Sequence, residues 1–332
     1  MREEPRGFSG EVRLDQLPRE VEWSAWMISY TVRRLAISAP VLLLLAALTF
    51  FLLRLAPGGP FDSDRAWPPE IQANIAAKYE LDRPVYVQFA HWIRDVAHGD
   101  LRESFQYLGR PVTMIVAESL PTSIYLGFLA LVFSMAVGIP LGAVAASKQN
   151  TWIDHTAMFF AISGISLPSY LIASLLILVF ALWLGWLPPA LWDEPGSWIL
   201  PVVTLGWRPM AMLARFTRTS MLEVFRTDYI RTAYSKGLSG RAVVFKHALK
   251  NSLIPVVTLL GPIAANLVTG SFLVEMVFQI PGMGKHFVQA VINRDYPLVM
   301  GVTLVYGTIL ILSNLIVDLL YAWIDPRIRL ND

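Results

Sequence analysis

The sequence contains few side chains arranged for catalysis or metal binding. Its five histidines lie in different segments; His91 and His98, seven residues apart, could share a helix face but have no carboxylate partner. A phosphate-binding loop needs a Gly, four residues and then Gly-Lys-Ser/Thr, but near Lys285 the first Gly is replaced by Gln279 and the hydroxyl residue by His286. Because Gly-x-Ser-x-Gly and His-Glu-x-x-His motifs are also absent, we expect no catalytic residue and no metal ligands.

Positive charge is concentrated in one polar stretch. Residues 215–252 hold eight of the 27 Lys and Arg residues beside only two acids, Glu223 and Asp228. Such a surface suits docking against another protein, for which no catalytic group is needed. The alternative is an ordinary solvated loop.

The residue order in this stretch predicts two short helices joined at a glycine. Tyr229–Ser235 favours a helix, Gly237 is able to adopt the left-handed conformation that ends one, and Ser239 is able to cap a second. The second helix is predicted from Ala242 to Leu249, with its lysines on the polar side. The pattern therefore predicts a basic elbow.

The composition is that of a membrane protein. Of 332 residues, 55% are hydrophobic and 16% are charged, and the mean hydropathy is +0.51. Ordinary soluble domains carry about 25% charged residues. A net charge of +2 excludes a nucleic-acid binder built on bulk charge, and the lack of cysteine excludes disulfides, iron–sulfur clusters and thiolate zinc sites.

The apolar residues lie in blocks long enough to cross a bilayer. Roughly 20 residues at about 1.5 Å each are needed. Five blocks without a charged residue or histidine meet this length: Leu35–Leu53, Pro121–Ser147, Thr156–Trp192, Leu253–Val274 and Pro297–Val317. A sixth and weaker span is Trp198–Met221, in which Arg215 and Arg218 are expected to snorkel to the interface. We predict an all-α integral membrane protein with six transmembrane helices.

The distribution of Lys and Arg predicts that both termini are cytoplasmic, because basic residues favour that side. No secretory signal peptide is visible, so the first span would act as an uncleaved anchor. The predicted parts are a cytoplasmic extension (1–27), span 1 (28–56), an extracytoplasmic helical subdomain (57–118), a five-span core (119–323) with a cytoplasmic loop (221–252), and a cytoplasmic tail (324–332). Within the extension, an interfacial helix and a disordered tail remain alternatives.

Several residues within the spans are candidates for lining a translocation path. Prolines interrupt three spans and bend helices that commonly border a passage, although proline is also frequent in membrane helices. Arg208 is the deepest charge and is a candidate to receive a carboxylate, the alternative being snorkelling. The candidates are Arg208, Pro140, Pro168, Pro262 and Glu275.

The basic elbow resembles the characteristic cytoplasmic loop of ABC-importer permeases. Arg231-Thr232-Ala233 stand where the general motif has Glu-Ala-Ala, and Gly237 is in register. The match is closer to the variant of peptide and nickel permeases, in which His247, Leu249 and Lys250 also fit. Further stretches resemble the same family, closest to the B-type permeases of oligopeptide importers: Arg33–Leu35, Arg54–Pro60, Ala56–Asp62, Pro68–Glu70, Ala76–Tyr79, His98–Leu101, Gly270–Glu275, Ile280–Gly284, Asn293–Tyr296 and Asp325–Arg329.

The resemblance implies a permease subunit of the bacterial inner membrane that imports peptides and is itself no enzyme. It implies a C-type permease as pseudo-symmetric partner, two ATPase subunits that hold ATP and Mg, and an extracytoplasmic solute-binding protein. The residues expected to couple this chain to the ATPases are Arg231, Thr232, Ala233, Lys236, Gly237, Ser239, Arg241, His247, Leu249, Lys250 and Pro255. Arg208 departs from the family pattern, so no family role carries over to it.

Other functions remain open. The same type of subunit could import dipeptides, antimicrobial peptides or nickel complexes. A stand-alone secondary carrier would be expected to show internal repeats, and an intramembrane enzyme would need paired Asp, His or Ser residues at membrane depth. The sequence shows neither feature.

Overall fold

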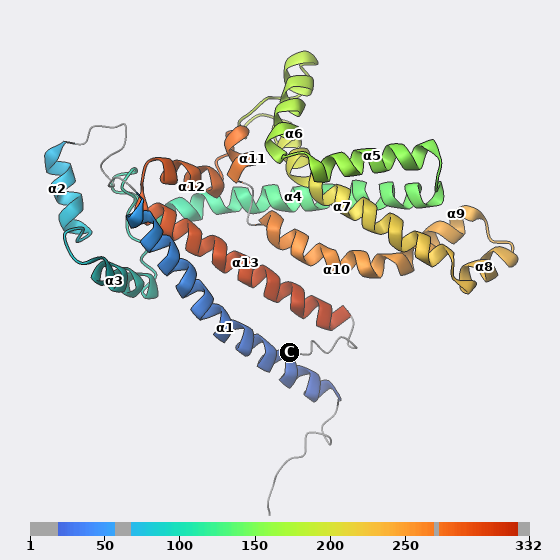
Figure 1. Ribbon diagram of the computed structural model, residues 1–332, viewed down its shortest axis with the longest axis horizontal. Helices are drawn as coiled ribbons and strands as arrows, with labels where there is room; N and C mark the ends of the chain where they lie inside the picture. Colours follow the sequence, from blue (N-terminus) through green and yellow to red (C-terminus); the bar gives the residue numbers. More distant parts are fainter. Residues whose placement is uncertain (1–18, 57–67, 269–271, 325–332) are drawn as a thin grey trace, which may run out of the picture.

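The computed structural model describes residues 19–56, 68–268 and 272–324 (Figure 1). The extension before residue 19, the segment 57–67 of the predicted outer subdomain, residues 269–271 and the tail 325–332 lie outside the described residues. The helices are α1 (Arg19–Leu55), α2 (Pro69–Lys78), α3 (Val85–Ala97), α4 (Val112–Ser147), α5 (Trp152–Ser166), α6 (Ser169–Leu176), the π-helix η2 (Ile177–Trp183), α7 (Ile199–Phe225), α8 (Asp228–Ser235), α9 (Gly240–Ala242), the π-helix η3 (Val243–Ala248), α10 (Leu249–Val268), α11 (Phe272–Val277), α12 (Met283–Ile292) and α13 (Tyr296–Ile324).

The apolar blocks of the sequence form helices of membrane-spanning length. Within the described ranges, four stretches are long and apolar enough to cross a bilayer: Met27–Leu55, Val112–Ser147, Val243–Leu267 and Tyr296–Leu319. The pair α5 and α6–η2 makes up to five if it is counted as one broken span. The arginine-bearing α7 is not among them, so the sixth span remains a prediction.

Proline interrupts a helix at one of the three predicted positions. The axes on either side of Leu167 and Pro168 differ by 117°. Pro168 has no N–H to donate, and the residue before it is held extended, with ψ 135° at Leu167. Helices α4 and α10 continue through Pro140 and Pro262. The predicted bend is therefore confirmed at Pro168, where α6 turns away from the bundle (Figure 1).

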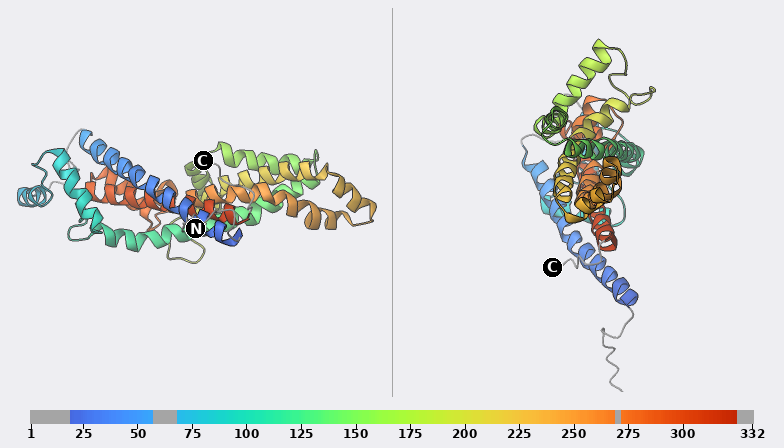
Figure 2. Two further views of the ribbon diagram at one scale, coloured as in Figure 1. Left: turned by 90° about the horizontal axis from the view of Figure 1, so that it is seen from below. Right: turned by 90° about the vertical axis from the view of Figure 1, so that its right-hand side faces the viewer.

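Helices α4 and α7 pack closely along their length through small residues. A Cβ added to Gly138 would lie 2.6 Å from the Met210 carbonyl oxygen, and one added to Gly142 would lie 2.3 Å from that of Ala214. The Ser134 hydroxyl donates to the Gly206 carbonyl at 2.9 Å. Small residues let membrane helices approach to backbone contact, where dispersion and hydrogen bonds hold them together. Helices α5 and α10 each contact both α4 and α7 within the elongated bundle (Figure 2).

The predicted outer subdomain contains α2 and α3, and one buried carboxylate joins it to the core. Asp295, fully buried before α13, accepts hydrogen bonds from the Ser104 hydroxyl and from the backbone N–H groups of Phe105 (3.0 Å) and Gln106 (3.1 Å). It also caps α13 by accepting from Leu298 N–H at 3.2 Å. Asp295 thus accepts hydrogen bonds both from residues 104–106 and from the first turn of α13.

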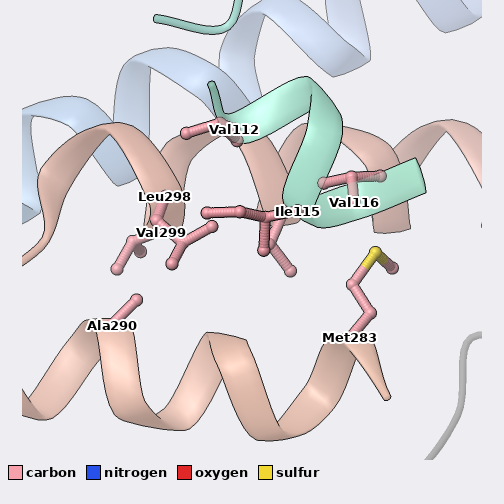
Figure 3. Close-up of a cluster of buried hydrophobic side chains, with 8 residues drawn as sticks. Val112, Ile115, Val116, Met283, Ala290, Leu298 and Val299 are labelled. Atoms are coloured by element: carbon pink, nitrogen blue, oxygen red, sulfur yellow. The ribbon is translucent and has the colours of Figure 1, made fainter. Parts of the chain in front are cut away.

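Apolar packing beside Asp295 completes the junction. Side chains of α4, α12 and α13 form a buried cluster that includes Val112, Ile115, Met283 and Leu298 (Figure 3). Helix α4 begins at Val112, inside the segment predicted as outer subdomain, because its first turns belong to this cluster.

Helix α1 lies against α13 and has polar contacts near its middle and at its C-terminal end. Arg54 donates to the Gln88 side-chain oxygen at 2.8 Å, and Arg34 pairs with Asp318 at 2.9 Å. The chain is already helical from Arg19, so the described part of the predicted extension is the start of α1 and not a separate interfacial helix.

We predict that Gly142→Ala destabilises the protein by about 2 kcal/mol, because the new methyl group would overpack the contact with α7. The helix propensity of alanine, about 1 kcal/mol better than that of glycine, offsets only part of this. The measurement is thermal unfolding in detergent. Gly240→Ala is the matched control, since nothing lies within 4 Å of its added Cβ. An unchanged midpoint for Gly142→Ala would show that the close α4–α7 contact at this glycine does not determine the stability of the protein.

Candidate functional site

The predicted basic elbow is present, and its first helix ends as expected. Helix α8 spans Asp228–Ser235, and Gly237 has φ +78°. The N–H of Leu238 bonds to the Ala233 carbonyl at 3.4 Å, and that of Gly237 bonds to the Tyr234 carbonyl at 2.9 Å. These two bonds form a Schellman motif, which requires a left-handed residue at the glycine position. We call residues 228–248 the elbow.

The second arm of the elbow differs from the prediction. Ser239 caps it as expected, because its side chain accepts from Ala242 N–H at 3.4 Å. However, α9, η3 and α10 follow one another without a break to Val268, so the predicted separate helix Ala242–Leu249 is the first part of a spanning helix. No glycine or proline lies between Gly240 and Pro255 to end it. Movement of this arm is therefore movement of the base of α10.

One face of the elbow is seated on the bundle. Ile230 and Ala233 of α8, with Val243 of η3, are buried against Met221 of α7. Ala143 and Ala146 at the end of α4 complete the cluster. The Asn251 amide donates to the Tyr229 hydroxyl at 2.7 Å and joins α8 to α10. The elbow thus contacts α4, α7 and α10 at once.

The other face is basic and aromatic. Among the side chains that the structure describes, the exposed cations of the elbow and of the first turn of α10 are Arg231, Lys236, Lys246 and Lys250. Beside them Tyr234 and Phe245 are 50% and 60% exposed. The Arg231–Asp228 pair, at 3.6 Å and highly exposed, adds little to stability. Aromatic and basic side chains together are typical of protein interfaces.

The remaining predicted coupling residues lie on or just beyond the elbow. Thr232 bonds to its own helix through the Asp228 carbonyl at 3.0 Å. His247 and Leu249 are half-buried, and Pro255 lies exposed within α10. Arg241 lies in α9, and its side chain is outside the described part of the chain.

A buried ion pair next to the elbow was not predicted from the sequence. Asp154 of α5 is 1% exposed, and Arg218 of α7 donates to its two oxygens at 2.6 and 2.7 Å. Asn150 N–H donates to the same carboxylate at 3.0 Å. Arg218, expected to snorkel, instead makes a two-pronged contact that fixes α5 to α7. The signal available in the sequence was an acid opposite a basic helix end, but nothing in it showed that the two helices are neighbours.

The structure does not bring all five predicted path residues together. Arg208 and Pro262 are exposed on the neighbouring helices α7 and α10. Pro140 lies on the exposed apolar side of α4 with Val132 and Val144, and Pro168 lies at the break between α5 and α6. Their path roles remain predictions.

Glu275, the fifth path candidate, has a structural contact that the sequence did not indicate. It is fully buried, and one of its oxygens accepts from Gly284 N–H at 2.7 Å in the first turn of α12. A Cβ on Gly282 would lie 2.3 Å from this oxygen. The carboxylate thus satisfies a helix N-terminus that Gly282 and Gly284 leave open.

Comparison with known proteins identifies the relatives of this chain. Residues 138–330 match the family described as binding-protein-dependent transport system inner membrane component, and residues 27–126 match its N-terminal counterpart. The oligopeptide transport system permease protein OppB of Haemophilus influenzae is 45% identical over 91% of this chain and 100% of its own length. The dipeptide transport system permease protein DppB of Bacillus subtilis is 41% identical over 92% of this chain and 99% of its own. Among solved structures, a chain of the inward-facing MetNI methionine ABC transporter matches 64% of this chain and 99% of its own length, at 18% identity and a TM-score of 0.49.

We predict that Asp154→Ala lowers the free energy of unfolding by about 2–4 kcal/mol, because it leaves the Arg218 guanidinium without its carboxylate. The double variant Asp154→Ala with Arg218→Ala should cost less than the sum of the single variants. Chemical denaturation of all three variants measures this coupling energy. Additive effects would contradict a direct interaction. Exposed Glu223→Ala is the control and should be close to neutral.

Proposed function

Because this chain belongs to the family of inner membrane components of binding-protein-dependent transport systems, and is therefore a membrane subunit of an ABC importer, we propose that it conducts peptides, oligopeptides in particular, into the cytoplasm. The observation that supports this is the 45% identity to an oligopeptide permease over 91% of the chain. The similarity to a dipeptide permease makes dipeptides the second candidate cargo.

In this proposal the chain contributes one half of a passage. A C-type permease would supply the other half, and an extracytoplasmic solute-binding protein would deliver cargo to the side that carries α2 and α3. The elbow lies at the opposite end of the long axis from α2 and α3 (Figure 1). The binding protein and the ATPases would therefore act at opposite ends of the chain. The chain is a multi-pass membrane protein, and we place both its termini in the cytoplasm.

We propose that the elbow receives an ATPase subunit and transmits its movement. ATP and Mg would be bound by the two ATPase subunits, and this chain would supply no catalytic residue. Force on the elbow would reach α10 directly because the second arm and α10 form one continuous helix, and it would reach α7 through Met221. The Asp154–Arg218 pair would carry the displacement of α7 onward to α5.

The elbow's glycine provides the test. Proline cannot adopt φ +78° and has no N–H for the Tyr234 carbonyl, so Gly237→Pro should disrupt the turn between the arms. In proteoliposomes holding the complete complex, we expect peptide uptake to fall at least tenfold while the basal ATP hydrolysis of the ATPases persists. Gly237→Asn, which tolerates the left-handed region, should retain most uptake.

Two results would contradict the proposal. Unimpaired coupling in Gly237→Pro would remove the elbow from energy transmission. Uptake driven by an ion gradient, with this chain alone in the vesicle, would indicate a secondary carrier instead.

A further inference from the structure

Helix α7 carries an exposed polar stripe. Arg208, Arg215 and Thr219 are exposed and Met212 is half-buried, at spacings of four, three and four residues. Such spacing places them on one face of a helix. Within the part of the chain that the structure describes, neither the Arg208 nor the Arg215 side chain forms an ion pair or a hydrogen bond; the guanidinium carbon of Arg215 lies 5.7 Å from the centre of the Phe216 ring.

Helix α10 carries a similar stripe. Asn251, Pro255, Thr258, Pro262 and Asn266 are all exposed, at spacings of four, three, four and four residues. The Thr258 hydroxyl donates to the Pro255 carbonyl at 2.7 Å, which leaves its oxygen lone pairs able to accept. A spanning helix thus presents two amides and a hydroxyl on a single face.

The two stripes face the same side of the bundle. Helices α7 and α10 contact each other, and α4 packs against both, filling one side of the pair. On α7, Leu205 and Phe216 belong to a cluster with residues of α4 and α10, while Ala211 and Ala214 pack with Ala161 of α5. The exposed residues of α7 therefore lie between α5 and α10, away from α4. Helix periodicity places the stripe of α10 on the same side, between its contacts with α7 and α13.

The opposite side of the bundle has a contrasting surface. The exposed residues of α4 include Tyr125, Phe128 and Val132, each about half exposed, and the stripe continues through Val144. Lipid accommodates these side chains, but two arginines are costly to expose to it. One side of the chain is therefore suited to lipid, and the other to water or protein.

The two arginines are separated along the axis of α7 by a distance that a short peptide can span. At 1.5 Å per residue, Arg208 lies about 14 Å from the start of α7 and Arg215 about 24 Å, so their positions differ by about 10 Å along the axis. That distance is about the length of three extended peptide residues. Guanidinium groups bind carboxylates through two parallel hydrogen bonds.

We propose that the α7–α10 stripe lines the passage and that Arg208, followed by Arg215, binds the carboxylate of a peptide in transit. Thr258 and its neighbours on α10 offer partners to the peptide backbone. This inference rests on the proposed function and specifies its cargo as peptides with a free carboxylate. The competing explanation for Arg208 is an ion pair with an acid of the partner permease.

The test compares one pentapeptide in two forms, with a free C-terminal carboxylate or a C-terminal amide, at concentrations that saturate the binding protein. The complete complex in proteoliposomes is measured for uptake, ATP hydrolysis and subunit co-purification. We expect the wild type to import the carboxylate form about tenfold faster than the amide, the factor typical of a charged hydrogen bond. Arg208→Gln should bring this ratio close to one, and Arg208→Lys should restore part of it. Val132→Ala on α4 is the control and should leave the ratio unchanged.

The outcomes separate the possibilities. Equal wild-type rates, or an unchanged ratio in Arg208→Gln with normal co-purification, would overturn the inference while leaving the proposed function intact. Equal loss of both peptides with poor co-purification of the partner permease would assign Arg208 to the subunit interface and also overturn it. A wild-type complex that imports neither peptide would refute the proposed function itself.

Discussion

The close contact between α4 and α7 is the constraint on which the rest of the structure depends. It brings backbone to backbone at Gly138, Gly142 and Gly206, and any side chain at these positions would force the helices apart. In a bilayer no hydrophobic force drives helices together, so the association depends on close packing and on bonds such as that from Ser134. Helices α5 and α10 are then positioned against this pair.

Buried acids fix the parts that α4 and α7 do not hold directly. Asp154 joins α5 to α7, Glu275 holds the start of α12, and Asp295 joins the outer subdomain to α13. Each carboxylate accepts from at least one backbone N–H group, and Asp154 also has a guanidinium. A buried carboxylate needs such donors, and at Asp154 and Asp295 they come from segments far apart in the sequence.

The arrangement gives the elbow direct contact with α4, α7 and α10. Its second arm is the base of α10, and its buried face rests on the ends of α4 and α7. The basic outer face remains available to a partner. The same helices that carry the elbow, α7 and α10, also carry the polar stripe, so a displacement of the elbow would move the residues proposed to meet cargo.

Local features of this protein could be predicted from sequence, and pairings between distant residues could not. Blocks of apolar residues determine spanning helices, Pro168 determines a break, and Gly237 with Ser239 determines a turn, because each effect acts within a few residues. The continuity of the elbow with α10 was missed because helix boundaries depend on what each turn packs against. The partners of Asp154 and Asp295 lie 64 and about 190 residues away, and the exposure of Arg208 depends on α4 occupying the other side of α7. Only the packing of the helices decides which faces meet, and through that which charges are buried, which are paired and which remain exposed.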